Sequence, residues 1–388
     1  MFIRTFTWGQ ANLSWSTVME QTLLAAEKQG HFVSFISTNG YDGMQHWTEA
    51  LSRDRAAQAK AFLKGAPFDL DITYTAPENL PSRFLASSKI KACRFDYESS
   101  ICPPKWRGFW RFADFFLPSS HYVAKMFLAA GCPQEKIVVV PCGVDANIFK
   151  PDGEKFLIPS EKKFKFLCIG EPHYRKQIDK LLALYCKTFS AADDVTLVLK
   201  TKIFDDATIK ERQIFEQDLR PVLSDLKKLH GSSMPEITLL TERIPNIADL
   251  YRAADAFVLM TASEGFGLPF LEAVACGLPV IAPRWGGQLD FLNDGNSILT
   301  GCGQRPALHQ EQYWHERPVA RAVVGAPDEV AYAEAMAALV KNAEAVRNKL
   351  LPGMLSTAQQ FTWESAAQKL TLDPLLAGQS GSTAPSAP

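Results

Sequence analysis

The stretch Glu264-Gly265-Phe266-Gly267-Leu268-Pro269-Phe270-Leu271-Glu272 decides how this chain is interpreted. An apolar run at 256–260 precedes it and predicts a buried strand, and a helix-like run that stops at Gly277 follows. The glycines therefore lie where a strand ends and a helix begins, and free backbone N–H groups there favour a phosphate. Gly265 and Gly267 let the backbone approach a ligand closely. If the loop folds over a sugar nucleotide, one carboxylate can face the sugar and the other the ribose.

These residues resemble the E-x7-E signature of retaining glycosyltransferases with the GT-B fold, those of family four (group 1) in particular. Recognisable pieces run from about residue 90 to 370, whereas the first 90 residues match only in pattern. The resemblance implies an α/β GT-B fold, in which two Rossmann-like domains face each other across a cleft. It also implies that the C-terminal domain binds a nucleotide sugar, that the N-terminal domain binds the acceptor, and that the anomeric configuration is retained. The other matching segments are Pro118-Ser119-Ser120, Gly131, Pro141-Cys142-Gly143-Val144-Asp145, Cys276-Gly277-Leu278-Pro279-Val280-Ile281-Ala282, Trp285-Gly286-Gly287 and Phe361-Thr362-Trp363-Glu364.

The composition is that of an ordinary globular protein, with 388 residues of which 47% are hydrophobic and 21% are charged. The net charge of −1 provides no basic field for nucleic acid, so no nucleic-acid partner is expected. No apolar run approaches the ~20 residues that cross a bilayer, and the N-terminus lacks the apolar core of a signal peptide. A cytoplasmic location is therefore predicted, with peripheral contact at the inner face of the membrane left open.

Eight cysteines lie along the chain without a C-x-x-C pair, and several of them fall inside apolar runs. A free cysteine in such a run behaves as a small hydrophobic residue. Core packing is therefore predicted for them rather than a zinc site or disulfides, in keeping with a reducing compartment.

Strands and helices alternate along two halves of the chain, which predicts βαβ units and parallel sheets. Pro151, Gly153 and Pro159 break the alternation and predict a connector at 145–163. The predicted parts are an N-terminal acceptor domain at 1–150, a nucleotide-sugar domain at 151–360, a closing helix at 361–377 that crosses back to the first domain, and a disordered tail at 378–388.

Within these domains the strands are expected at 2–6, 32–36, 71–74, 90–95, 115–117, 137–140, 164–169, 195–199, 236–240, 256–260 and 279–282. Residues 301–326 are expected to form a loop insertion that contains Tyr313 and Trp314. The last helices are expected at 328–346 and 362–372.

A basic segment from Gly170 to Lys176 follows the first strand of the second half. Ligands of α/β sheets bind at the carboxyl ends of the strands, so Arg175 and Lys176 are candidates for the diphosphate leaving group of a sugar nucleotide. The alternative is a solvated basic start of a helix. The resemblance implies an arginine directly after Gly170 and a lysine further on. Lys176 matches that lysine, but Glu171 stands in place of the arginine, and Lys200 is a candidate to replace it.

The resemblance assigns the carboxylates of the glycine loop to the donor. It implies that Glu272 binds the ribose, although a glutamate in the first turn can also simply complement the helix dipole. Glu264 is expected near the transferred sugar, through its carboxylate or as an organiser of the loop. The remaining donor contacts are expected from the backbones of Gly265, Phe266, Gly267, Leu268 and Ile244.

The acceptor side carries fewer signals. Gly9 is expected to shape the first domain near the phosphate, Glu98 is either a polar acceptor contact or a capping residue, and His121 is more typical of a helix cap than of a catalytic base. Asp69 and Asp71 form a D-x-D string, which holds a divalent metal in glycosyltransferases of the other fold. They lie at a strand entry far in sequence from the glycine loop, so a structural role is predicted, and with it a reaction without metal ion or cofactor.

These patterns predict a glycosyltransferase that moves a sugar from a nucleoside-diphosphate sugar to a hydroxyl of a saccharide or lipid-linked acceptor. Two alternatives stay open: a synthase, phosphorylase or epimerase with the same donor loop, and a non-catalytic protein that binds sugar nucleotides. Glu264, Glu272 and Lys176 favour an active transferase, whereas Glu171 weakens that interpretation. Polysaccharide biosynthesis is expected only by family-level analogy, and the sequence specifies neither the sugar nor the base.

Overall fold

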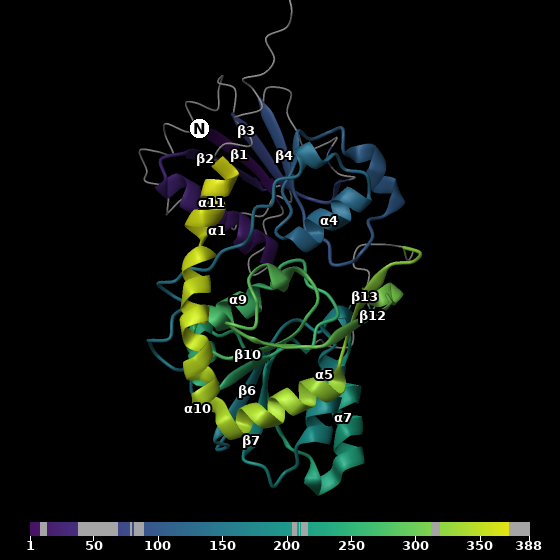
Figure 1. Ribbon diagram of the computed structural model, residues 1–388, viewed down its shortest axis with the longest axis vertical. Helices are drawn as coiled ribbons and strands as arrows, with labels where there is room; N and C mark the ends of the chain where they lie inside the picture. Colours follow the sequence, from purple (N-terminus) through teal and green to yellow (C-terminus); the bar gives the residue numbers. More distant parts are fainter. Residues whose placement is uncertain are drawn as a thin grey trace, which may run out of the picture. The chain divides into compact units, whose positions relative to one another are not determined.

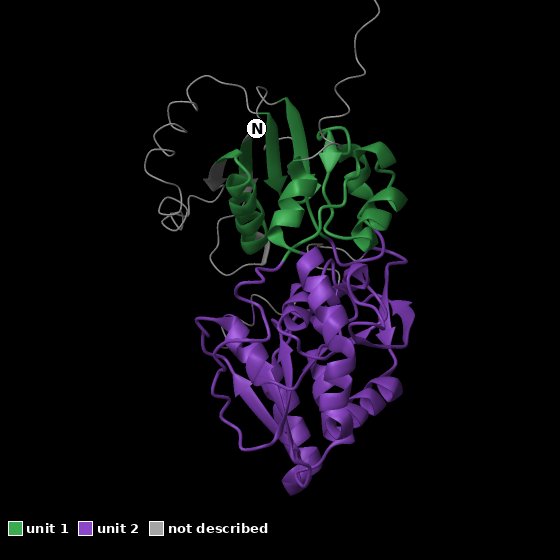
Figure 2. Cartoon of the chain, turned by 60° about the vertical axis from the view of Figure 1, so that its left-hand side comes forward, with its two compact units in different colours: residues 1–96, 102–143, 362–388 green, residues 97–101, 144–361 purple. Residues whose placement is uncertain are grey.

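The computed structural model divides the chain into two compact units, each built on a parallel sheet (Figure 2). The first unit contains Met1–Asp96, Cys102–Gly143 and Thr362–Pro388, and the second contains Tyr97–Ile101 and Val144–Phe361. The short piece Tyr97–Ile101 therefore belongs to the second unit although its neighbours in the chain belong to the first. The structure describes residues 1–7, 14–37, 69–77, 80, 89–203, 208, 210, 216–311 and 319–371.

The first unit has a five-stranded parallel sheet in the order β2-β1-β3-β4-β5 (Figure 1). Helix α11 packs against α1, and Gln29 at the end of α1 donates from Nε2 to the carbonyl of Glu364 over 2.9 Å. Helix α4 begins after Ser120, whose side chain accepts a hydrogen bond from the backbone N–H of Val123. The elements of this unit are β1 (Phe2–Thr7), α1 (Ser14–Lys28), β2 (Phe32–Ser37), β3 (Leu70–Tyr74), β4 (Ile90–Arg94), η2 (Pro104–Phe109), β5 (Phe115–Phe116), α4 (His121–Ala129), η3 (Gln134–Lys136) and α11 (Trp363–Thr371).

The second unit has a six-stranded parallel sheet in the order β11-β10-β9-β6-β7-β8. The chain starts at β6, adds β7 and β8 on one side, and then returns to add β9, β10 and β11 on the other side. The strand order thus reverses between β6 and β9. Such a reversal is where doubly wound α/β sheets bind ligands. The strands are β6 (Phe164–Ile169), β7 (Val195–Lys200), β8 (Glu236–Leu240), β9 (Ala256–Val258), β10 (Val280–Pro283) and β11 (Ile298–Thr300).

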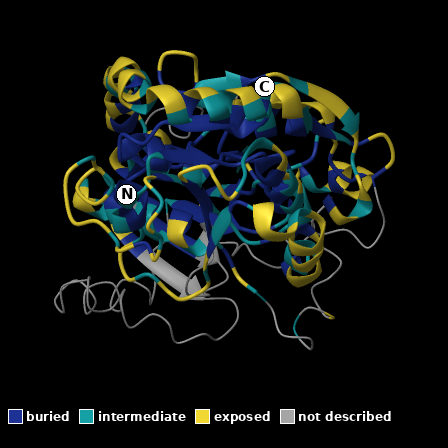
Figure 3. Cartoon of the chain, turned by 90° about the horizontal axis from the view of Figure 1, so that it is seen from below, coloured by how far each residue is buried: buried dark blue, intermediate teal, exposed yellow. Residues whose placement is uncertain are grey.

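Helices of the second unit bury one apolar side each. In α5 the residues Ile178, Leu181, Leu182 and Tyr185 recur at helical spacing and are all fully buried. Figure 3 shows the same contrast, with buried positions along the strands and exposed ones on the outer faces of helices. The helices and 3-10 turns are η4 (Tyr174–Lys176), α5 (Ile178–Thr188), α7 (Leu219–His230), η5 (Gly231–Ser233), α8 (Ile247–Ala253), α9 (Leu268–Ala275), η6 (Gly287–Asp290), η7 (His309–Glu311) and α10 (Glu329–Gln360).

Three expected elements differ from the structure. Residues 137–140 make only one bridge, between Ile137 and Phe116, and the strand does not continue because Pro118 has no N–H to donate. The expected loop insertion begins and ends as an antiparallel hairpin of β12 (Cys302–Pro306) and β13 (Val323–Pro327), while Tyr313 and Trp314 lie outside the described residues, as does the tail at 378–388.

The helix expected to end at residue 346 continues to Gln360 as α10. It bends at Asn342, whose φ of −134° is not helical, and it continues through Pro352 (Figure 1). Burial of Leu350 and Met354 along the second part shows why it persists, since tertiary packing outweighs the poor helix propensity of proline.

The cysteines are packing residues in the described structure. Seven of the eight are buried, Cys302 is half-buried, and all are free thiols. The described helices are each too short or too polar to cross a membrane.

Candidate functional site

The loops that follow β6 and β9 meet at the switch point of the second unit. The carbonyl of Arg175, in the loop after β6, accepts hydrogen bonds from the backbone N–H of Ala262 at 2.7 Å and from Oγ1 of Thr261 at 3.1 Å. Both of these donors follow β9. The position is the one that the fold offers to a ligand, and the charged residues predicted from the sequence gather there.

Lys176 is buried in the loop after β6, with 7% of its surface exposed. It lies in the short turn η4, and Gln177 adopts a left-handed conformation (φ 51°) before α5 begins. A Cβ atom on Gly170 would lie 3.3 Å from Cδ of Lys176, so the glycine gives the lysine room to pack over the strand end. Lys176 is therefore not a solvated start of a helix.

Glu264 is the centre of this charged cluster. Its Oε1 lies 2.8 Å from Nζ of Lys176 and 3.1 Å from a guanidinium nitrogen of Arg175. Thr261 donates to the same oxygen over 3.3 Å. Burial on its own would raise the pKa of Glu264, but Lys176 and Arg175 outweigh it and lower this pKa to about 2. The side chain is thus a fixed anion between two fixed cations.

Arg175 also makes contacts beyond Glu264. Its NH1 group donates to the carbonyl of Ser263 at 3.0 Å, and its NH2 group lies 2.9 Å from Oε1 of Glu98. Glu98, expected on the acceptor side, belongs to the piece of chain that the structure groups with the second unit. Arg175 therefore joins two carboxylates, an arrangement that the sequence spacing does not reveal.

The glycine loop, residues 264–268, is fixed by the packing of Phe266 and by a backbone hydrogen bond to Glu264. Gly267 has a φ of 94° and is the N-cap of α9, a backbone conformation that suits glycine. Phe266 is 5% exposed and packs against Phe291 and Phe361, with ring centroids 5.0 and 6.3 Å apart. The carbonyl of Glu264 accepts a hydrogen bond from the N–H of Gly287 at 2.8 Å. The loop is thus anchored through Phe266, as a loop that offers its backbone to a ligand requires.

Glu272 is the fifth residue of α9 and not part of its first turn. The hydroxyl of Tyr251, on α8, donates to its Oε2 over 2.7 Å. Burial raises the pKa of Glu272 to about 7, and the hydrogen bond from Tyr251 opposes this shift only in part. Dipole complementarity at a helix start therefore does not explain this glutamate, because burial makes its carboxyl group costly to ionise without a further partner.

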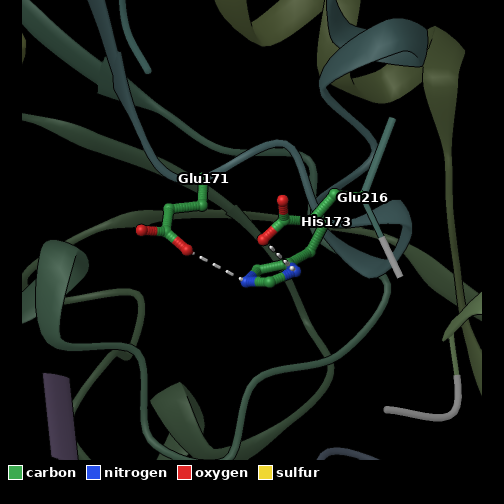
Figure 4. A group of neighbouring side chains, drawn as sticks. All are labelled: Glu171, His173 and Glu216. Carbon is green, nitrogen blue, oxygen red and sulfur yellow. Dashed lines mark ion pairs between the residues drawn. The ribbon is translucent and has the colours of Figure 1, made fainter. Parts of the chain in front are cut away.

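Glu171, the residue in place of the expected arginine, belongs to a cluster with His173 and Glu216 (Figure 4). His173 directs Nε2 at Glu171 over 3.5 Å and Nδ1 at Glu216 over 3.9 Å. Lys202 donates to the other oxygen of Glu171. The hydrogen bond with His173 is the largest influence on Glu171, and together with Lys202 it lowers the pKa to about 2. Three ligand atoms of this cluster lie within 4.8 Å of one another, so it is the group of described side chains with the spacing for a metal ion.

The other predicted residues are spread more widely. Lys200 ends β7, its carbonyl accepts from the N–H of Gly170, and burial followed by repulsion from Lys202 lowers its pKa. Ile244 lies half-buried in the turn between β8 and α8. His121 is the exposed first residue of α4, and Gly9 lies outside the described residues.

The D-x-D string is engaged in ion pairs of the first unit. Asp71 on β3 is paired in register with Arg4 on β1, and their two hydrogen bonds measure 2.7 and 2.5 Å. Both side chains are buried, with 5% of the Arg4 side chain and 0% of the Asp71 side chain exposed. Asp69 pairs with Lys89 over 2.7 Å. The two aspartates thus face two different cations.

Two contributors to the site were missed in the sequence. Thr261 stands three residues before Glu264 in the loop after β9, and its hydroxyl donates to that carboxylate over 3.3 Å. Tyr251 precedes β9 on a buried helix, and a buried tyrosine hydroxyl needs a hydrogen-bond partner. The sequence identifies neither partner, which only the folded chain brings close.

Comparison with known proteins identifies a family that part of the chain resembles. Residues 163–342, all within the second unit, match the family described as "Glycosyl transferases group 1". This confirms the resemblance drawn from the E-x7-E stretch.

Individual relatives and structures extend the comparison. A probable sucrose-phosphate synthase of Thermosipho melanesiensis is 32% identical over 185 residues, 46% of this chain and 38% of the relative. A D-inositol 3-phosphate glycosyltransferase of Segniliparus rotundus is 31% identical over 160 residues, 39% of this chain and 33% of the relative. The chain thus spans between a third and two fifths of the length of these relatives.

A solved structure covers nearly the whole chain. Anabaena Alr3699/HepE in complex with UDP-glucose superposes with a TM-score of 0.64 over 95% of this chain and 98% of its own, at 16% identity. Such a likeness establishes the fold, and the predicted class, an α/β GT-B fold with two Rossmann-like units, is confirmed.

Proposed function

We propose that this protein is a retaining, metal-independent glycosyltransferase that moves a sugar from a nucleoside-diphosphate sugar to a saccharide or lipid-linked hydroxyl. The observation that carries the proposal is the buried Lys176–Glu264–Arg175 cluster at the switch point, eight residues before Glu272. It combines fixed positive charge with two carboxylates, one in the loop before α9 and one inside this helix. The names of the relatives, a synthase of a sugar phosphate and a glycosyltransferase, support the same class of reaction.

Each group has a role in this reaction. Departure of the diphosphate builds negative charge, and fixed cations such as Lys176 together with the N-terminus of α9 stabilise it. Glu272 accepts hydrogen bonds from the ribose, which gives its buried carboxyl the partner it needs. Glu264 faces the sugar or fixes the loop that does so. The leaving phosphate assists deprotonation of the acceptor hydroxyl, which attacks from the same face, so no covalent nucleophile is required of the chain.

Independence from metal ions rests on where the carboxylates stand. Asp71 is neutralised by Arg4 inside a sheet, and Asp69 faces Lys89. In the cluster of Glu171, His173 and Glu216, the two ring nitrogens face different carboxylates, and Lys202 already compensates Glu171 (Figure 4). Positive charge for the diphosphate is available from Lys176 without an ion.

The first test is a donor panel of UDP-glucose, ADP-glucose and GDP-mannose, read by thermal shift and then by turnover with sugar, sugar-phosphate and lipid-linked acceptors. A ligand at 100 times its dissociation constant stabilises by roughly 2.7 kcal/mol. We expect at least one nucleotide sugar to stabilise the protein and to be consumed with retention. Binding without turnover on any acceptor would favour a non-catalytic sugar-nucleotide protein instead.

The second test addresses metal. Turnover should survive EDTA, and Asp71→Asn should affect stability rather than rate. Loss of turnover in EDTA that manganese restores in the wild type, but not in Glu216→Gln, would replace this proposal with a metal-dependent mechanism at the Glu171–His173–Glu216 cluster.

A further inference from the structure

We propose that Glu98 is a positioning residue of the donor site, which acts through Arg175 on Glu264. The inference rests on the proposed function, because it assigns Glu264 to the transferred sugar. It gives the short piece Tyr97–Ile101 a task in the second unit, where the sequence suggested an acceptor contact or a cap.

The contact between Glu98 and Arg175 is short and sheltered. The two side chains are 17% and 12% exposed, and their charged atoms lie 2.9 Å apart. The opposite nitrogen of the same guanidinium lies 3.1 Å from Glu264 and donates to the carbonyl of Ser263 at 3.0 Å. Because a guanidinium is planar and rigid, fixing one end of Arg175 fixes the direction of the other end.

The backbone around Glu98 is tied to the same loop by a second route. Ser100 accepts a hydrogen bond at Oγ from the N–H of Val323 on β13, at 2.8 Å. Two residues further along β13, the N–H of Gly325 donates to the carbonyl of Ala262 at 2.8 Å. Ala262 in turn donates to the carbonyl of Arg175 at 2.7 Å. These bonds close a ring from Tyr97–Ile101 through the hairpin to the loop after β9 and back to Arg175.

The charges explain why the ring includes a carboxylate. Lys176 and Arg175 provide two positive charges, and Glu264 supplies one negative charge to both. Glu98 adds the second negative charge and balances the cluster. Glu98 therefore compensates the guanidinium charge at NH2, while NH1 of the same group faces Glu264.

A purely structural anchor would behave differently from a positioning residue. Loss of an anchor lowers stability and weakens every ligand alike. Loss of positioning at Glu264 leaves the affinity for the nucleoside diphosphate intact, because Glu272 and Lys176 hold that part, and affects the step in which the sugar is transferred. Small displacements of positioned groups can cost up to about a hundredfold in rate.

The test uses the full chain with UDP and UDP-glucose as first probes, or the corresponding pair of whichever donor binds in the panel above. Glu98→Gln keeps the size of the side chain and removes its charge, and Arg175→Lys removes the rigid fork. Asp225→Asn is the matched control, because Asp225 forms an exposed ion pair with Lys228 on α7. We expect Glu98→Gln to lower kcat about tenfold or more and to leave the Kd of the nucleoside diphosphate within twofold, while the control changes neither.

The double variant decides between coupling and coincidence. If Glu98 acts through Arg175, then Glu98→Gln adds nothing to the rate loss of Arg175→Lys. The proposal would be overturned if the kcat loss of the double variant were the product of the two single losses. It would also be overturned if Glu98→Gln weakened nucleoside-diphosphate binding by as large a factor as it lowers kcat.

Failure of the proposed function has a separate signature. If the wild-type protein binds no nucleotide sugar at all, the proposed function is wrong. The coupling between Glu98 and Glu264 is then measured from the free energies of unfolding of Glu98→Gln, Glu264→Gln and the double variant. Additive unfolding effects would then reject the positioning role, and coupled effects would support it.

Discussion

Glu272 shows at the scale of one residue how a buried carboxyl group can serve a ligand. Its pKa of about 7 follows from burial, and Tyr251 provides one hydrogen bond where an ionised carboxylate can accept several. In the unliganded protein, ionisation of Glu272 near neutral pH therefore lowers the stability of the fold. A ribose whose hydroxyls donate to the carboxylate would offset this destabilisation. Protonation of Glu272 should therefore affect both the stability of the protein and its affinity for the donor.

The stability prediction follows from the sign of this shift. The folded-state pKa lies above the ordinary value of 4.5, so native Glu272 keeps a proton between pH 4.5 and 7 that the unfolded chain loses. Its contribution is fully present below pH 4.5 and is lost as the pH rises to 7. Glu272→Gln should therefore match the wild type near pH 4.5 and exceed its unfolding free energy by at most about 3 kcal/mol at pH 8, measured by urea unfolding. An equal effect at both pH values would contradict this account.

The binding prediction concerns the same proton. Donor affinity of the wild type should rise from pH 6 to pH 8, because the ionised carboxylate is the better acceptor for ribose hydroxyls. In Glu272→Gln this pH dependence should disappear, and the affinity should fall by roughly 1.5–3 kcal/mol at pH 8. Titration calorimetry at the two pH values measures both effects, and unchanged affinity in the folded variant would remove Glu272 from the site.

Lys176 tests the placement of the diphosphate. Lys176→Ala removes a buried cation 2.8 Å from Glu264, so turnover should fall about 10²–10³-fold. Removing one partner of a buried ion pair lowers the free energy of unfolding by about 3–5 kcal/mol. Because Arg175 still faces Glu264 in this variant, we expect a loss of stability of about 3 kcal/mol. The control is Lys163→Ala in the connector, because the Lys163 ammonium lies 3.5 Å from the exposed Asp194 and outside the site. Equal rates for the two variants would show that the diphosphate binds elsewhere.

At the scale of elements, the start of α9 depends on Gly267. An alanine there would need a left-handed conformation, and its Cβ would lie 2.9 Å from Cδ2 of Phe270. Gly267→Ala should destabilise by about 2–4 kcal/mol, of which the backbone accounts for about 1 and overpacking for the rest. Gly131→Ala is the matched control, because it has a φ of 85° with open space around it, and should cost only the backbone part. Thermal unfolding of the two variants side by side measures the difference.

The elements also show what the sequence could and could not predict. The strands at β6, β7 and β8 were predicted because short apolar runs between turn signals mark buried parallel strands. The hairpin β12–β13 was missed because Gly303 and Pro306 weaken its local strand signal, and its partner is 17 or more residues away. The second part of α10 was missed because Pro352 and Gly353 look like a helix end, and only burial against the rest of the unit shows that they are not.

The site was predictable to the extent that its residues follow strands. Lys176 was placed at the site because it follows a strand of the sheet, whereas Glu264 and Glu272 were assigned from the family resemblance of the glycine loop. Their partners Glu98 and Tyr251 could not be predicted, since an ion pair across 77 residues of chain leaves no periodic trace. The role of Glu171 also needed the structure, because its partner Lys202 leaves another strand.

At the scale of the whole molecule, the chain passes from one unit to the other at 96/97, 101/102, 143/144 and 361/362. The connector expected at 145–163 therefore contains only residues of the second unit, beginning just after one of these passages. It follows that neither unit is a continuous piece of sequence. A fragment of residues 144–361 would contain Arg175 and Glu264 and would lack Glu98.

The same interleaving has a consequence for how proteins of this fold can be recombined. Chimeras that exchange the N-terminal half between relatives would be joined near residue 143, where the second unit resumes. A junction there imports the foreign residue at position 98 opposite the native Arg175. Under the proposed function, new acceptor specificity would then arrive together with a disturbed donor site, and the lower rate would be mistaken for poor acceptor recognition. Hybrids that carry Glu98 along with the C-terminal half would keep the two properties separable.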